Sequence, residues 1–397
     1  MKAVVFFLAL LSLPRFAFCQ DQQDPYGTER LHFGPLALTP TVGLTNFGID
    51  TNVFNQVENP KRDFTAIVSP QTDLWLRLGK GRLSGRTRLD YVYFGRYETE
   101  RAVNTHDDVR IEISLNRLKP YVSESFLNAR ERPGYEIDAR SRRVENTLTV
   151  GTDVRVGPKT TVGFSAWRTK IKFDADEVFL GTYLSEVLNR AADGLRVSVR
   201  HRLTPLTSFV IDAEAQRDRF EFSSVRNSDS VRIMPGLDLG VFALISGSGR
   251  VGFRKFDPLS AGAPSSFRGL VASADLGYAL LGVTRFSVHT ERDIAYSFSI
   301  DEPYYVQTGA SGTITQKVTA RWDVQASVGR YRLDYQPVIG LSGDHKDYVR
   351  NVGAGVGYTI GPSTRLGVNL DHYRRKSDRD TRDYDGLRLG TSVTYGF

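Results

Sequence analysis

Short turn signals recur through most of this 397-residue chain, and their spacing constrains its fold more than any other feature. Neighbouring turns lie about 35 to 47 residues apart, and each is flanked by two runs of alternating polarity. Longer polar segments separate these pairs of runs. The spacing predicts a series of antiparallel hairpins, with tight turns at one end and longer loops at the other. The turn signals are residues 79–81, 117–120, 157–159, 204–205, 246–248, 281–282, 318–320 and 361–362.

Alternation of apolar and polar residues assigns two faces to each predicted strand. In residues 363–371, Leu366, Val368 and Leu370 share one face, and polar residues and glycine occupy the other. Residues 109–116 and 270–280 follow the same pattern. Because successive side chains of a strand point to opposite faces, a period of two predicts strands with one apolar and one polar face.

Together these features predict an all-β transmembrane protein: an antiparallel up-and-down β-barrel with short periplasmic turns and longer extracellular loops. Eight turns join sixteen strands, and an opening strand at 36–46 with a closing strand at 387–397 raises the number to about 18. Sixteen strands is the alternative. A β-propeller would need four short strands per repeat, whereas these repeats carry two longer ones. A soluble sandwich would alternate too, but these polar faces carry many charges on long strands that no helix covers.

Aromatic residues near the predicted strand ends also favour the membrane barrel, because interfacial girdles lie at that level. The alternation slips near Gly329 and Arg330. The slip indicates either a bulge or the point at which the strand leaves the bilayer. The aromatic residues are Tyr91, Tyr93, Phe94, Tyr331, Tyr335, Tyr373, Tyr395 and Phe397.

The N-terminus is typical of an exported protein. Lys2, an apolar run at 3–13 and small residues before position 20 predict a signal peptide over 1–19. We expect a periplasmic extension over 20–34 and the barrel over 35–397, located in the cell outer membrane. Cys19 is the single cysteine, so the exported chain is predicted to lack disulfides. No apolar run after the signal approaches the length of a membrane-spanning helix.

The positive charge is carried mainly by arginine, with 52 basic residues against 45 acidic ones. Arginine is preferred where charges are paired and partly buried. We therefore interpret the positive charge as part of the protein's own structure and not as a nucleic-acid binding surface.

The polar faces predict a lumen crossed by ion pairs. The strand at 195–202 is basic and its hairpin partner at 208–218 is acidic, so we expect a cross-strand charge ladder. Such a ladder could simply stiffen the barrel and keep the lumen wet, which is the more economical reading, or set a transverse field that selects polar or charged solutes. The predicted ladder residues are Arg86, Arg88, Asp90, Arg196, Arg200, Arg202, Asp212, Glu214, Asp218, Arg365 and Asp371.

The C-terminal strand ends on an aromatic residue. Val393, Tyr395 and Phe397 share one face of this strand. It resembles the terminal strand by which bacterial outer-membrane proteins are recognised by the barrel assembly machinery.

The N-terminal region shows a more particular resemblance. Asp50, Asn52, Val53 and Phe54 form an Asp-x-Asn-Val-Phe motif at the end of the opening strand. This motif, and residues 39–155 around it, resemble the putative β-barrel porin 2 family. The resemblance implies an outer-membrane barrel, and members are often encoded near exopolysaccharide synthesis systems.

Enzyme chemistry is weakly signalled. His289 shares the polar face with Ser287 and Glu291, but a nucleophile and its base usually come from different strands. We expect no enzyme activity, no cofactor and no metal site. Two loops stand out: residues 174–190, which could fold inward as a constriction or pack outside, and residues 377–385, dense in both charges.

The sequence therefore predicts a porin-like channel for hydrophilic solutes, with exopolysaccharide as the solute that the resemblance implies. The alternative is an occluded barrel with a structural or assembly role in an envelope polysaccharide complex. Expected partners are outer-membrane lipids and lipopolysaccharide, the barrel assembly machinery and polysaccharide export components, but no nucleic acid.

Overall fold

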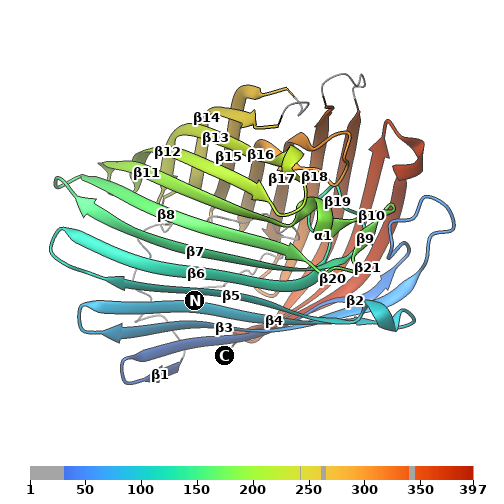
Figure 1. Ribbon diagram of the computed structural model, residues 1–397. Helices are drawn as coiled ribbons and strands as arrows, with labels where there is room; N and C mark the ends of the chain where they lie inside the picture. The colour runs from blue at the N-terminus through green and yellow to red at the C-terminus, as the bar shows by residue number, and fades with distance from the viewer. Residues whose placement is uncertain (1–30, 242, 261–264, 339–344, 397) are drawn as a thin grey trace.

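The computed structural model describes residues 31–241, 243–260, 265–338 and 345–396. In these segments eighteen long strands form one closed antiparallel barrel (Figure 1). The predicted fold class and strand number are confirmed. The predicted signal peptide, residues 20–30 of the expected extension and Phe397 lie outside the described residues.

The long strands share a length of 12 to 16 residues. They are β2 (Leu36–Asp50), β3 (Asp63–Leu78), β4 (Gly81–Phe94), β5 (Ala102–Ile113), β6 (Leu118–Glu131), β7 (Ser141–Arg155), β8 (Thr160–Phe173), β11 (Arg190–Thr204), β12 (Thr207–Phe220), β13 (Ser228–Leu239), β14 (Ile245–Pro258), β15 (Phe267–Leu280), β16 (Thr284–Tyr296), β17 (Tyr304–Lys317), β18 (Trp322–Gln336), β19 (Lys346–Ile360), β20 (Thr364–Ser377) and β21 (Tyr384–Gly396).

The remaining elements are short. They are β1 (Leu31–Phe33), β9 (Val178–Phe179), β10 (Thr182–Tyr183), α1 (Leu184–Leu188), η1 (Glu98–Glu100), η2 (Ser224–Arg226) and η3 (Asp380–Arg382). No helix in the described segments is long and apolar enough to span a membrane.

Each long strand pairs with the next one along the chain, and β2 pairs with β21 to close the barrel. The register of β2 shifts between Leu44 and Phe47, where Asn46 has a φ of 52°. This bulge lets the opening strand continue to Asp50, four residues beyond its predicted end. β1 folds back on the start of β2, so the last residues of the predicted extension form a small hairpin.

The two faces of the strands separate as the alternation predicts. Leu195, Val197 and Val199 of β11 are exposed on the outside of the barrel, whereas the intervening Arg196 and Arg200 are half-buried on the inside. Tight turns gather at the left of Figure 1, and α1 with the longer loops lies toward the other end. In barrels of this kind the tight-turn end is periplasmic.

The turn predicted at residues 246–248 is wrong. β13 ends at Leu239 and β14 begins at Ile245, so the turn lies before the predicted position and residues 246–248 belong to β14. Gly247 has a φ of 122°, and a Cβ there would lie 1.9 Å from the carbonyl oxygen of Asp275. Glycine at this position therefore serves a close approach of two strands rather than a turn.

β18 passes through Gly329 and Arg330 with unbroken register to both neighbouring strands. The break in alternation at these residues is therefore not a β-bulge. Beyond this point the inward residues Tyr331, Leu333 and Tyr335 are buried. These inward side chains of β18 are large and buried, whereas Arg330 and Arg332 on its outer face are exposed and charged, as expected where a strand leaves the bilayer. Tyr331 and Tyr335 are therefore not girdle residues, and neither is the buried Phe94.

Candidate functional site

Ion pairs line the lumen between the basic strand β11 and the acidic strand β12. Arg196 stands directly opposite Glu214, and its guanidinium lies 2.5 Å from the carboxylate. Asp212 instead takes Arg250 of β14 at 3.1 Å, and Arg200 pairs with Asp238 of β13 at 3.1 Å. The predicted basic and acidic strands are adjacent, but some of their charged side chains form ion pairs with residues of β13 and β14 instead of with each other.

Three arginines that the sequence did not single out extend this ladder. Arg232 bridges Glu214 and Asp293 at 3.0 Å each, and Arg254 reaches Asp293 at 2.7 Å. Arg250 also pairs with Asp238 at 2.5 Å. Their inward alternation on β13 and β14 is the signal that could have identified them.

The other predicted ladder residues are more dispersed. Arg86 pairs with Asp73 at 2.5 Å, Arg88 with Asp90 at 2.8 Å, and Arg365 with Asp323 at 2.5 Å. Three residues stand apart from the ladder proper. Arg202 donates to the carbonyl of Pro158 in a tight turn, Asp218 lies 3.8 Å from Arg190, and Asp371 stands opposite Arg388.

A loop that the sequence did not indicate crosses the lumen. Residues 132–140 connect β6 to β7, yet the Tyr135 ring stacks on Tyr331 of β18 with centroids 4.0 Å apart. Since β6 and β7 are the fifth and sixth of the eighteen strands and β18 is the fifteenth, the loop reaches the opposite wall. At its start, Arg132 donates to the carbonyl of Val53 at 2.7 Å.

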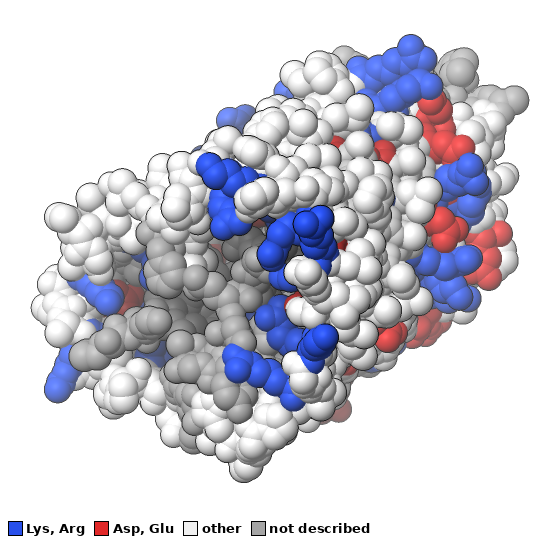
Figure 2. All heavy atoms as spheres, turned by 90° about the vertical axis from the view of Figure 1, so that its left-hand side faces the viewer, with Lys and Arg blue, Asp and Glu red and all other residues white. Residues whose placement is uncertain are grey.

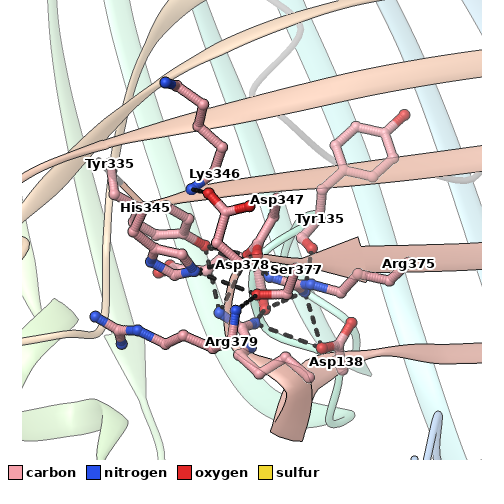
Figure 3. Close-up of polar contacts among 12 residues, drawn as sticks. Tyr135, Asp138, Tyr335, His345, Lys346, Asp347, Arg375, Ser377, Asp378 and Arg379 are labelled. Atoms are coloured by element: carbon pink, nitrogen blue, oxygen red, sulfur yellow. Dashed lines mark hydrogen bonds and ion pairs between the residues drawn. The ribbon is translucent and has the colours of Figure 1, made fainter. Parts of the chain in front are cut away.

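Buried charges fasten this crossing loop to the far wall (Figure 3). Arg375 of β20 donates to the carbonyl oxygens of Tyr135 and Glu136, at 2.9 and 3.0 Å, and to the Asp138 carboxylate at 2.9 Å. Its other amino group meets Asp347, and both residues are fully buried. Arg382 adds contacts to Asp347 and Asp138 at 3.4 Å each. Two arginines between two aspartates compensate for the desolvation of all four groups.

A histidine continues the network toward the outer loops. His345 stacks on Tyr335 with centroids 4.3 Å apart, and its ring nitrogens lie 3.1 Å from Glu302 and 3.2 Å from Asp347. Burial lowers the pKa of His345, but the hydrogen bonds to Asp347 and Glu302 outweigh burial and raise the pKa above its ordinary value.

Glu136 is the most buried carboxylate of the crossing loop, with a relative exposure of 2%. It accepts hydrogen bonds from the Ser297 hydroxyl at 2.6 Å and from the Phe298 N–H at 3.2 Å. Burial raises the pKa of Glu136 to about 7, against the opposing charges of Arg382 and Arg375.

The loop at residues 174–190 folds inward, the first of the two alternatives for it. Leu184, Val187 and Leu188 of α1 are buried against Ile137 of the crossing loop. This apolar cluster also includes Phe298 from the β16–β17 connection. The two loops therefore narrow the extracellular half of the lumen together.

The Asp-x-Asn-Val-Phe motif lies at the seam between the first and last strands. Asp50 pairs with Arg388 of β21 at 2.8 Å and accepts the Tyr373 hydroxyl at 2.5 Å. The Asn52 amide donates to carbonyls of Gln56 and Asp385. The other two residues of the motif are apolar. Val53 is buried, and the Phe54 ring packs edge-on against Tyr97.

The C-terminal strand runs along the same seam. Val393 and Tyr395 stand opposite Leu44 and Val42 of β2 on the outer face. These positions are consistent with a strand that completes the barrel.

His289 is hydrogen-bonded to a carboxylate and does not lie beside a nucleophile. It lies 2.7 Å from Asp275 of β15, and Glu291 accepts a hydrogen bond from Gln307 at 3.1 Å. Ser287 stands opposite Gly277 and Thr313, not against the imidazole. In the described segments no group of three or more His, Cys, Asp or Glu side chains is arranged to hold a metal ion.

Basic side chains predominate around the mouth at the tight-turn end (Figure 2). Lys80, Arg117, Lys159 and Arg321 are exposed within tight turns, and no acidic residue stands in these turns. The periplasmic mouth therefore carries a positive field.

Comparison with solved structures supports the fold. The outer membrane protein opdK from Pseudomonas aeruginosa superposes with a TM-score of 0.50 at 10% identity, covering 91% of this chain and 99% of that one. OpdQ from the same organism superposes with a TM-score of 0.50 at 11% identity, covering 91% of this chain and 98% of that one. No curated protein matches the chain.

The family comparison covers nearly the whole sequence. The model described as "Putative beta-barrel porin 2" matches residues 24–397, and the barrel fold agrees with it. Family and fold indicate an outer-membrane channel rather than an enzyme. The chain belongs to the Putative beta-barrel porin 2 family.

Proposed function

We propose that this protein is a passive outer-membrane channel for hydrophilic solutes. The observation that carries the proposal is the eighteen-strand circumference with a charged interior. Barrels of sixteen to eighteen strands are wide enough for an aqueous lumen, whereas eight strands are filled by their own side chains. The crossing loop narrows this lumen without being part of the wall.

The positive periplasmic mouth supports a preference for negatively charged solutes. A rim of one sign raises the local concentration of the opposite charge. We propose polysaccharide as one solute, on the basis of the family's association with exopolysaccharide synthesis systems. An acidic polysaccharide segment would combine both features.

Liposome swelling tests the proposal. Proteoliposomes containing the purified barrel should swell in isotonic solutions of small sugars and acidic oligosaccharides, and more slowly as the solute lengthens. Liposomes that never swell, even with the smallest sugars, would refute the channel. Loss of exported polysaccharide after deletion of the gene would support the substrate separately.

A second candidate is an occluded barrel with a structural or assembly role in an envelope polysaccharide complex. The buried ties between residues 132–140 and the opposite wall favour it. Absence of swelling, together with co-purification of envelope proteins, is the outcome that this candidate predicts.

A further inference from the structure

The outer face of β18, β19 and β20 changes abruptly from apolar to basic. Strand register places its residues in rows of three, one from each strand. Arg330, Arg350 and Arg374 form one such row, called the arginine row below, and all three are exposed. The rows that precede it from the tight-turn end are Trp322–Tyr358–Leu366, Val324–Val356–Val368, Ala326–Ala354–Leu370 and Val328–Val352–His372.

The position of the arginine row matches the outer border of the membrane. Trp322 marks the periplasmic side, and Arg330 follows eight residues later on the same face, about 27 Å along the strand. Strands of such barrels are tilted, and their apolar band is about 25 Å tall. The arginines therefore lie where the apolar band ends, on the side of the extracellular loops.

No ion pair within the described segments includes Arg330, Arg350 or Arg374. Asp385 stands opposite Arg374 at the end of the row, but its carboxylate lies 4.0 Å from His372. Like charges directly opposite each other on neighbouring strands destabilise a sheet. An anion between the guanidinium groups would remove this repulsion.

Several outward-facing cations elsewhere on the wall are paired with carboxylates. Arg168 lies 3.6 Å from Asp193, Arg219 2.7 Å from Asp229, and Lys255 2.7 Å from Asp257. The arginine row differs from these pairs, because three cations stand side by side and none of them forms a salt bridge within the described segments.

We infer that the arginine row binds the phosphorylated headgroup of a glycolipid in the outer leaflet. Phosphate oxygens accept paired hydrogen bonds from the guanidinium fork, which favours arginine over lysine for such a site. The apolar rows directly below offer a surface for the acyl chains of the same lipid. The ring of Tyr348, 5.6 Å from the Arg330 guanidinium, supports that side chain from one side.

Binding to purified full-length barrel in detergent tests this site. Native mass spectrometry would compare doubly phosphorylated lipid A, its dephosphorylated form and inorganic phosphate. We expect the phosphorylated lipid to bind best, and the triple variant R330Q/R350Q/R374Q to bind it roughly tenfold or more weakly. The matched variant R168Q/R219Q/K255Q removes the same number of outward charges and should bind like wild type.

Three results would overturn the inference. They are equal binding of the two lipid forms, wild-type affinity in the arginine-row variant, and inorganic phosphate binding as tightly as the lipid. Heat-resistant migration on gels checks that each variant is folded. If the triple variant fails to fold, two tests remain. Binding of the two lipid forms to wild-type protein can still be compared, and the single variant R350Q can be tested for weaker binding of the phosphorylated lipid.

Discussion

Arg375 and Asp138 lie 2.9 Å apart, although Asp138 belongs to a loop that begins on β6, six strands away from β20 around the barrel. The same guanidinium holds two carbonyl oxygens of that loop and the buried Asp347. Arg375 thus contacts three residues of the crossing loop from the wall of the barrel.

Replacing Arg375 by Met should release the crossing loop. Asp138 and Asp347 would lose a buried partner, a change that costs about 3–5 kcal/mol when one member of a buried pair is removed. Hydrogen exchange at residues 132–140 should therefore accelerate strongly. Lys376→Gln, one residue further on and exposed, is the control and should leave exchange unchanged. Equal protection of the loop in R375M and wild type would show that Arg375 does not hold it.

Rising pH should loosen the crossing loop. The pKa of Glu136 is raised from 4.5 to about 7, so the packed loop binds this proton more tightly than the released loop does. Packing is therefore most stable below about pH 4.5 and weakens as pH rises through 7. The raised pKa of His345 acts in the same direction, because its stabilisation is lost as pH rises through the folded-state value.

Conductance between pH 5 and 8 measures this effect. Wild type should conduct more as pH rises, and Glu136→Gln should flatten much of the dependence by removing the titrating group. Asp176→Asn, on an exposed part of another loop, should keep the wild-type profile. A profile that is the same in E136Q and wild type would count against Glu136 as the titrating group.

The charge ladder should set ion selectivity. Glu214 neutralises both Arg196 and Arg232, so Glu214→Gln leaves two lumen cations without this partner. The reversal potential in a salt gradient should shift toward anions. Asp193→Asn removes an equal charge from the outer face and should not shift it. No difference between the two variants would favour a purely structural role for the ladder.

The seam between β2 and β21 should be sensitive to Tyr373. Tyr373→Phe removes a hydroxyl whose single proton is shared between Asp50 Oδ1 at 2.5 Å and the Asn52 carbonyl at 2.9 Å. These two contacts together contribute about 1 kcal/mol. The barrel should unfold at lower urea concentration than wild type, while Tyr91→Phe, exposed on β4, should not change the midpoint. An unchanged midpoint for Y373F would argue that these bonds do not stabilise the closure.

The barrel could be predicted from sequence because its wall depends on local rules. Alternation decides which side chain faces the lipid, and turn residues decide where strands reverse, so most strands were placed correctly. The displaced turn at 246–248 shows the limit, because Gly247 marks a close approach of strands and not a reversal. Arg196 opposite Glu214 followed from the same reasoning about adjacent strands.

The crossing loop could not be predicted in this way. Its contacts, such as Tyr135 with Tyr331 and Asp138 with Arg375, join residues about 200 or more positions apart. Only closure of the barrel brings these residues together. Pro133 and Gly134, followed by apolar residues in a loop, were the signals present in the sequence. Pro-Gly marks a turn, but these residues give neither the path of the loop across the lumen nor its partners.

Single-channel conductance in planar bilayers tests the central claim most directly. Wild type should give discrete, ohmic steps, and a variant with residues 133–139 replaced by a Gly-Ser linker should give larger steps, because the loop narrows an aqueous lumen. Silent bilayers with both proteins, or identical steps from both, would contradict a channel that residues 132–140 constrict.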